Sequence, residues 1–297
     1  MDHITVATVA RNYYNLPFWI AQEQGLLEKH GLDVTFIEHD SVDVVTDHVR
    51  SGRAQIARGI TEHVILDRES EGHLEIVAGS INSLPFSLIC NPEVSSIEDL
   101  RGKIIGASSV DAGSSSLIME ILAQHGLRHP QDYTIKAVGP MMSRWTLLQN
   151  GEIAAGLQGI PMNFIALDNG FKTLIEPKDL FPEFQFSSLN VDRRWAQSNS
   201  AVLIRFLRVF KAAIEWFYVN RKLASDLTAR KMGLDQQYAD RAWDECVASH
   251  IIPRDAKASI QAIQTLIDVS GLIRAISKRT RTKADDYVNH WYLESAA

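Results

Sequence analysis

Cysteine, long apolar runs and clustered basic residues are all scarce in this 297-residue sequence. Cys90 and Cys246 are its only cysteines, and they match no CxxC or cysteine–histidine zinc spacing, so we expect two reduced, buried thiols and no metal site. The longest apolar stretch, 204–218, is interrupted by charged residues, whereas a bilayer span needs roughly 20 apolar residues in a row. No membrane-spanning segment is therefore expected. The net charge of −6 and the lack of a basic run argue against a nucleic-acid or anionic-membrane partner.

The beginning of the chain also lacks the features of an export signal. Residues 1–6 lead directly into a strand-like pattern, without the basic start, apolar core and small-residue cleavage site of a secretory leader. We therefore expect a periplasmic or membrane-associated protein if an export signal was removed before Met1. If Met1 is the true start, we expect a cytoplasmic protein.

The composition, 45% hydrophobic and 22% charged residues, is that of a globular protein, and the length suits two modest domains. In the first part of the chain, short strand-like segments alternate with amphipathic helical segments. The expected strands are 4–9, 33–38, 55–57 and 75–78, and the expected helices are 16–30, 42–51 and 61–71. This order favours a mostly parallel sheet with helices on its faces.

A second α/β unit and then a helical tail follow. The expected strands of this unit are 87–90, 103–107, 134–138, 154–157 and 171–175, with helices at 114–125, 143–150 and 161–169. The tail is expected to form helices at 198–221, 221–232, 235–249 and 255–270. We therefore predict an α/β protein of two lobes, residues 1–85 plus 190–297 and residues 86–189, joined by crossings near 82–90 and 185–191.

Three stretches of the sequence resemble a known family. They are NLPFWIAQEQGLLEKHGLDV at 15–34, SGRAQIA at 51–57 and IEDLRGKIIG at 97–106, and the segments 147–155 and 170–171 fit the same pattern. The pattern resembles the solute-binding proteins of ABC importers for sulfonates, taurine, nitrate and thiamin-pyrimidine precursors, a group that includes the NMT1/THI5-like domain. The resemblance covers about residues 4–225. It implies a type II periplasmic-binding-protein fold with a discontinuous first lobe, an inserted second lobe, a ligand cleft that closes by a hinge motion, and a helical C-terminal tail.

Candidate ligand-binding residues follow from where the expected strands end, because ligands of parallel α/β sheets collect at the carboxyl ends of the strands. The candidates are Arg11, Asn12, Tyr13 and Tyr14 after the first strand, Arg58, Gly59 and Thr61 after the third, Ser108, Ser109, Gly113, Ser114 and Ser115 before a helix of the second unit, and Gly139 and Gln158 after later strands.

These residues favour an anionic ligand. Arg11 and Arg58 are expected to lie near one another at the floor of the cleft, where bidentate hydrogen bonds would hold a carboxylate or sulfonate. The alternative is that these arginines form salt bridges with Glu62 or Asp40. The serine-rich helix start offers free amides and hydroxyls to a ligand oxygen, although helix capping alone would also use some of these serines. Arg144 is either a third cation of the site or a surface residue.

The resulting hypothesis is that the protein binds a small organic anion, a sulfonate or carboxylate with or without an aromatic ring, in the interlobe cleft and delivers it to an ABC permease without a cofactor. The alternatives are a cytoplasmic ligand sensor and a cytoplasmic enzyme of the decarboxylase, desulfinase or pyrimidine-precursor type. For an enzyme, the candidates are Cys90 as nucleophile and His63, which has the spacing of the histidine in the family's fungal thiamin-pyrimidine enzyme. The lysine expected four residues earlier is Gly59 here, and the cysteine-rich motif of that enzyme is missing, which argues against that chemistry.

Overall fold

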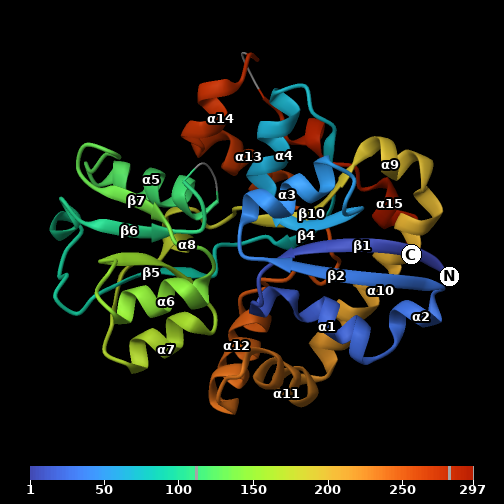
Figure 1. Ribbon diagram of the computed structural model, residues 1–297, viewed down its shortest axis with the longest axis horizontal. Coiled ribbons are helices and arrows are strands. Elements are labelled where there is room, and N and C mark those ends of the chain that lie inside the picture. Colours follow the sequence, from blue (N-terminus) through green and yellow to red (C-terminus); the bar gives the residue numbers. More distant parts are fainter. Residues whose placement is uncertain (111–112, 280–281, 297) are drawn as a thin grey trace.

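The computed structural model describes residues 1–110, 113–279 and 282–296, and it contains two five-stranded sheets flanked by helices (Figure 1). The first sheet has the order β2-β1-β3-β10-β4, and the second has the order β7-β6-β8-β5-β9. The strands of the first sheet are β1 (Asp2–Val9), β2 (Leu32–His39), β3 (Ile56–Ile60), β4 (Leu74–Ile81) and β10 (Ser187–Asp192). Those of the second are β5 (Phe86–Cys90), β6 (Ile104–Ala107), β7 (Thr134–Ala137), β8 (Ala155–Gly159) and β9 (Lys172–Ile175). The predicted two-lobed α/β fold is thus confirmed.

Each sheet combines parallel strands with one strand that runs the other way. β1 is parallel to β2 and β3, whereas β10 is antiparallel to both β3 and β4. In the second sheet β6 is parallel to β7 and β8, whereas β5 is antiparallel to both β8 and β9. β5 is the first strand after the chain leaves the first sheet, and β10 is the first strand after its return. Because β10 already begins at Ser187, residues 187–189 pair with the first sheet and not with the second, where the sequence boundary at 190 had placed them.

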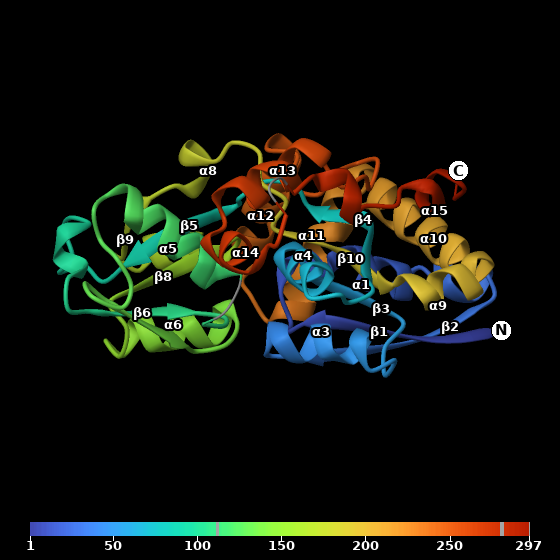
Figure 2. The same cartoon turned by 90° about the horizontal axis from the view of Figure 1, so that it is seen from above.

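Helices cover both sheets, and the chain ends in a helical tail packed on the first lobe (Figure 2). The first lobe contains α1 (Leu16–Glu23), α2 (Leu26–Lys29), α3 (Val42–Arg50) and α4 (Thr61–Glu69). Helices α5 (Ser114–Gln124), α6 (Met141–Gln149) and α7 (Met162–Asp168) belong to the second lobe, and α8 (Pro177–Leu180) lies in the return crossing. The tail comprises α9 (Arg193–Ser198), α10 (Ser200–Val219), α11 (Arg221–Met232), α12 (Gln236–Ala248), α13 (Ile260–Val269), α14 (Gly271–Ile276) and α15 (Trp291–Glu294).

Two expected helices differ from the sequence prediction. The helix expected at 16–30 is divided into α1 and α2, because Gly25 between them has a φ of +61°, the left-handed conformation that ends a helix. The helix expected at 255–270 begins only at Ile260, where the side chain of Ser259 caps it by accepting a hydrogen bond from the amide of Ala262. Helices α14 and α15 had no counterpart in the prediction.

The helical tail belongs to the core of the first lobe through α10. Phe206 and Phe210 on this helix are buried and pack on Phe18 of α1, with ring centroids 6.2 and 5.4 Å from that of Phe18. Aromatic side chains contribute much of the buried apolar surface of a core. The tail is therefore part of the hydrophobic core and not an appendage.

We expect Phe206→Ala to lower the free energy of unfolding by about 3–5 kcal/mol, because it leaves a cavity under α10. Urea unfolding followed by circular dichroism measures this change. Val219→Ala is the matched control, because Val219 lies at the end of the same helix with 64% of its surface exposed and should change the free energy by no more than about 0.5 kcal/mol. Equal effects of the two substitutions would contradict the packing of the tail described above.

Candidate functional site

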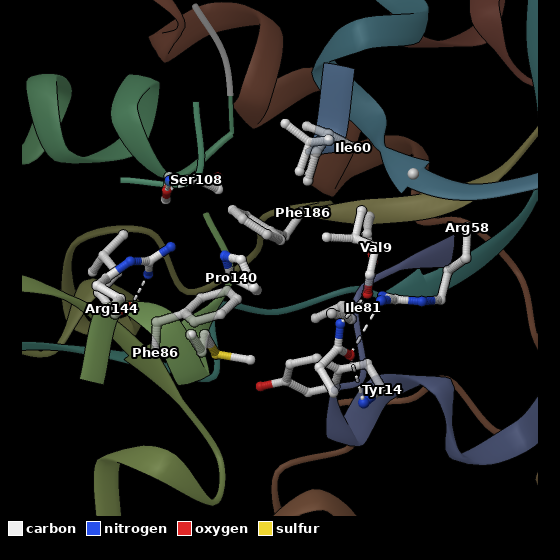
Figure 3. Close-up of a pocket in the computed structure, with 17 residues that line it drawn as sticks. Val9, Tyr14, Arg58, Ile60, Ile81, Phe86, Ser108, Pro140, Arg144 and Phe186 are labelled. Atoms are coloured by element: carbon white, nitrogen blue, oxygen red, sulfur yellow. Dashed lines mark hydrogen bonds between the residues drawn. The ribbon is translucent and has the colours of Figure 1, made fainter. Parts of the chain in front are cut away.

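A cavity lies between the two lobes, where the carboxyl ends of strands from both sheets meet (Figure 3). The space inside it that a water-sized sphere can enter is about 70 Å³, and the cavity opens to solvent. Its walls are mostly apolar, with Val9, Ile60 and Ile81 from the first lobe and Met141 and Leu157 from the second. A mainly apolar lining with a few polar groups is typical of sites that bind a small organic molecule.

Aromatic rings from the two crossings form one wall of this cavity. The ring centroids of Phe86 and Phe186 are 4.6 Å apart, and that of Tyr14 lies 6.2 Å from Phe86 in an edge-on arrangement. The Tyr14 hydroxyl donates a hydrogen bond to the carbonyl of Pro85 over 3.3 Å. Pro85 lies in the first crossing, Phe86 begins β5 and Phe186 directly precedes β10, so this wall lies where the chain passes between the lobes.

Arg58 supplies a positive charge from the first lobe. It lies in the middle of β3 and is only 4% exposed, and it donates hydrogen bonds to the side-chain oxygens of Asn15 (Nε, 2.8 Å) and Asn12 (Nη2, 3.1 Å). Among the described residues no carboxylate forms an ion pair with it. Burial lowers the pKa of Arg58 to about 10, so the side chain stays protonated at neutral pH.

Arg144 supplies a second positive charge from the other lobe. It lies on α6 and is only 3% exposed, so it is a residue of the cavity wall and not of the surface. Its guanidinium donates to the carbonyls of Leu157 and Gly139, and its Nε is buried with no hydrogen-bond partner in the described part of the chain. Burial lowers the pKa of Arg144 to about 10 as well, and no described carboxylate pairs with it. Figure 3 shows the two arginines on opposite sides of the cavity.

Six of the candidate residues line this cavity, namely Asn12, Tyr14, Arg58, Gly59, Ser108 and Ser114. The Asn12 side chain is held in place, because it donates to the carbonyl of Val9 and accepts from the amide of Tyr14 and from Arg58. The other candidates lie elsewhere: Arg11, Tyr13, Thr61, Ser109, Gly113, Ser115, Gly139 and Gln158 are outside the cavity lining.

Arg11 and Arg58 do not share the cleft floor, so that expectation was wrong. Arg11 is exposed and lines a separate hollow of the first lobe, together with Trp19 and Arg230. The next side chain, Asn12, turns back toward β1 and the cavity, so the two consecutive residues face different sides. Arg58 also forms none of the salt bridges considered for it.

Several other candidates serve the packing of the lobes. Tyr13 is fully buried in the core of the first lobe, where burial and the nearby Cys246 thiol raise its pKa. Thr61 exchanges a hydrogen bond of 3.0 Å with Ser188 of β10. Gly139 adopts a φ of +79°, and Gln158 is completely buried in β8.

The serine-rich start of α5 is occupied by a carboxylate of the same chain. Glu62 of α4 is 1% exposed and accepts hydrogen bonds from the amide of Gly113 (2.9 Å) and the hydroxyls of Ser116 (2.7 Å) and Ser270. Burial raises the pKa of the Glu62 carboxyl, and these donors act in the opposite direction. Because Glu62 belongs to the first lobe and Gly113 and Ser116 to the second, the carboxylate bridges the lobes.

Part of the same segment still faces the cavity. Ser108 donates from its amide to the Ser114 hydroxyl over 2.8 Å, and the two hydroxyls lie 2.9 Å apart. Both serines line the cavity and offer hydroxyl groups to a ligand. Asp111 and Ala112, in the same connection, lie outside the described residues.

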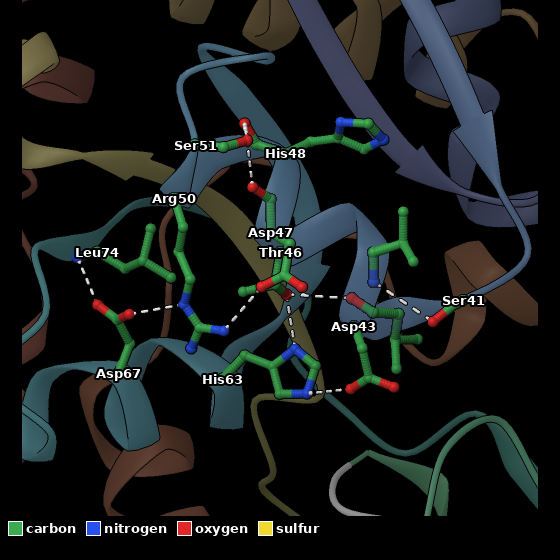
Figure 4. Close-up of polar contacts among 12 residues, drawn as sticks. Ser41, Asp43, Thr46, Asp47, His48, Arg50, Ser51, His63, Asp67 and Leu74 are labelled. Carbon is green, nitrogen blue, oxygen red and sulfur yellow. Dashed lines mark hydrogen bonds and ion pairs between the residues drawn. The ribbon is translucent and has the colours of Figure 1, made fainter.

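The two residues considered for catalysis lie away from the cavity. His63 points from α4 toward α3, with its Nδ1 2.6 Å from the Thr46 hydroxyl and its Nε2 3.4 Å from Asp43 (Figure 4). Cys90 is fully buried at the end of β5, and its Sγ lies 3.5 Å from the carbonyl of Lys172. Burial raises the pKa of Cys90, which keeps it a thiol and not a nucleophilic thiolate.

No helix in the described ranges is long and apolar enough to cross a membrane. Two α/β lobes, two crossings and a cleft between them form the periplasmic-binding-protein fold. The structure is similar to that of a Bordetella bronchiseptica protein, with a TM-score of 0.85, 17% identity and coverage of 100% of this chain and 97% of the other. It is also similar to the alkanesulfonate-binding protein of Xanthomonas axonopodis bound to MOPS, with a TM-score of 0.78, 17% identity and coverage of 97% and 98%.

The sequence comparisons give the family. The profile of the NMT1/THI5-like family matches residues 12–223, and the chain belongs to this family. A 4-amino-5-hydroxymethyl-2-methylpyrimidine phosphate synthase of Saccharomyces cerevisiae is 26% identical over 148 residues, which are 48% of this chain and 42% of that enzyme. The match therefore spans less than half the length of this curated relative.

We expect Glu62→Ala to separate the two lobes, because it leaves donors of the second lobe without their acceptor, at about 1–3 kcal/mol for each buried unsatisfied group. The separation is measured by electron paramagnetic resonance between spin labels at Asp40→Cys and Lys136→Cys. Both positions are exposed, one in each lobe, and the native cysteines are buried and should not be labelled.

Glu69→Ala is the matched control for this measurement. Glu69 is also a buried carboxylate of α4, but its hydroxyl donors, Tyr287 and Ser277, belong to the tail on the first lobe. This substitution should lower stability without changing the distance between the labels. An unchanged distance in Glu62→Ala would show that the carboxylate does not hold the lobes together.

Proposed function

We propose that this protein captures a small organic anion, a carboxylate or sulfonate with an apolar body, in the interlobe cleft and delivers it to an ABC-type permease. The observation that carries this proposal is the pair of buried guanidinium groups, Arg58 and Arg144, which face an apolar cavity without a carboxylate partner among the described residues. A bound anion would supply the missing counter-charge.

Burial of a charge without a partner costs several kcal/mol, and an anion that enters the cavity offsets this cost. Guanidinium groups also form paired, planar hydrogen bonds with carboxylates and sulfonates. No aspartate or glutamate lines the cavity in the described part of the chain, so a cationic ligand would meet only repulsion. The Ser108 and Ser114 hydroxyls add neutral donors beside Arg144.

The comparisons support the transport part of the proposal through the fold. The Xanthomonas protein is described as binding alkanesulfonates, and an Escherichia coli neighbour with a TM-score of 0.73 and 16% identity is described as a periplasmic sulfonate-binding protein. Hinge closure of two lobes around a ligand is a known mode of ligand capture. A periplasmic location and a permease partner belong to the same proposal.

An enzyme of the pyrimidine-synthase type is the second candidate, and the yeast relative is the finding that favours it. A catalytic group must come within about 3 Å of a reacting atom. His63 is engaged with Thr46 and Asp43 away from the cavity, and Gly59 stands at the position of the lysine expected from the fungal enzyme. The geometry therefore supports binding more strongly than this chemistry.

We expect Arg58→Ala to weaken binding of a carboxylate or sulfonate by about 1.5–3 kcal/mol, or about 10- to 150-fold, because it removes hydrogen bonds to a charged group. Isothermal titration calorimetry with a panel of such anions measures this change. Arg11→Ala is the control, because it removes an equal charge from outside the cavity and should leave the affinity within about twofold, close to 0.4 kcal/mol. Equal losses in both variants would indicate a long-range charge effect and not a contact.

A binding protein should return its ligand chemically intact. We expect mass spectrometry to detect no product after long incubation of the protein with a bound anion. Cys90→Ala should leave the affinity unchanged, since the thiol lies outside the cavity. Product that forms with the wild type but not with Cys90→Ala or His63→Ala would establish an enzyme instead.

A further inference from the structure

The two arginines of the cavity come from different lobes. Arg58 projects from β3 of the first lobe and Arg144 from α6 of the second, and they lie on opposite sides of the cavity (Figure 3). A monoanion at either arginine would leave the other buried guanidinium without a counter-charge. The arginine left without a partner would still carry the cost of burying its charge.

The start of α5 was the third predicted anion-binding group, but its donors already bind a carboxylate of the chain. The carboxylate of Glu62 accepts from Gly113 and Ser116, so the chain itself satisfies these donors. Ser108 and Ser114 remain at the cavity, but their hydroxyls are neutral. Within the described lining, therefore, Arg58 and Arg144 are the groups that determine how much negative charge the cavity accommodates.

The space between the arginines is apolar. Tyr14, Phe86 and Phe186 form a continuous aromatic wall, and aliphatic side chains cover much of the rest. A ligand with all of its charge at one end would place polar atoms against only one of the arginines. An apolar middle with an acid group at each end matches the distribution of charge in the cavity.

We propose that the ligand is a small dianion, with two acid groups separated by a short apolar body, one held by Arg58 and the other by Arg144. This inference rests on the proposed function and adds the ligand's charge and shape. It also explains how binding would close the cleft, because each acid group is held by a different lobe. An acid group replaced by a neutral amide of similar size would lose the ion pair at one lobe.

The test uses calorimetry on the full wild-type chain with two matched series of probes. The aromatic series is benzoate, terephthalate and the monoamide terephthalamate, and the aliphatic series is hexanoate, adipate and adipamate. In at least one series, we expect the diacid to bind at least tenfold more tightly than both the monoacid and the monoamide. The monoamide is the decisive comparison, because it has nearly the shape of the diacid but only one charge.

Two variants assign the charges. In Arg144→Gln, and separately in Arg58→Gln, the preference for the diacid over the monoamide should fall to about twofold or less. Far-ultraviolet circular dichroism and thermal melting verify that each variant is folded, and the wild-type series tests the proposal if a variant is not. Arg11→Gln is the matched control and should keep the full preference.

The outcomes separate this inference from the proposed function. If monoacids bind as tightly as diacids, the dianion inference is wrong while anion capture stands. If addition of formate raises the affinity of a monoacid to that of the diacid, two separate anions suffice and the inference is wrong as well. If no member of either series binds, the dianion inference is wrong, and the calorimetric panel that includes sulfonates decides whether anion capture stands.

Discussion

The chain crosses between its two sheets twice, and each crossing ends in an antiparallel strand inside a sheet. β5 lies between β8 and β9, and β10 lies between β3 and β4, so each is hydrogen-bonded on both sides. Neither strand can shift without breaking the backbone hydrogen bonds to both of its neighbouring strands. Any relative motion of the lobes would therefore be confined to the segments outside these strands, and the cavity lies where those segments meet the carboxyl ends of the parallel strands.

The alternation of elements was predictable because it depends on local patterns. Apolar periodicity indicated nearly all strands of both sheets, and glycines such as Gly31 and Gly52, which adopt positive φ, marked the ends of elements. The fold of the tail was less predictable from the sequence. Helices α14 and α15 are short and are stabilised by contacts with α4, α5 and α10, which are distant in sequence.

The site was predictable only in part, for a physical reason. The strand-end rule gave the correct segments, but the direction of each side chain depends on its local turn, as the opposite orientations of Arg11 and Asn12 show. Phe86 and Phe186 were missed because they lie in segments expected to serve only as connections. The contact between the Glu62 carboxylate and the start of α5 could not be predicted from the sequence either. Glu62 and Gly113 are brought together only by the packing of one lobe on the other.

Because the aromatic wall lies between the lobes, the fit of a ligand against it would affect the angle between the lobes. Phe86 begins β5 of the second lobe, whereas the amide of Phe186 is hydrogen-bonded to the carbonyl of Ile81 in the first, so a change in the angle between the lobes would also change the spacing of the rings. A ligand too thick to let the rings approach would stop the rotation early, and one too thin would leave them poorly packed. The angle between the lobes would thereby depend on the thickness of the ligand.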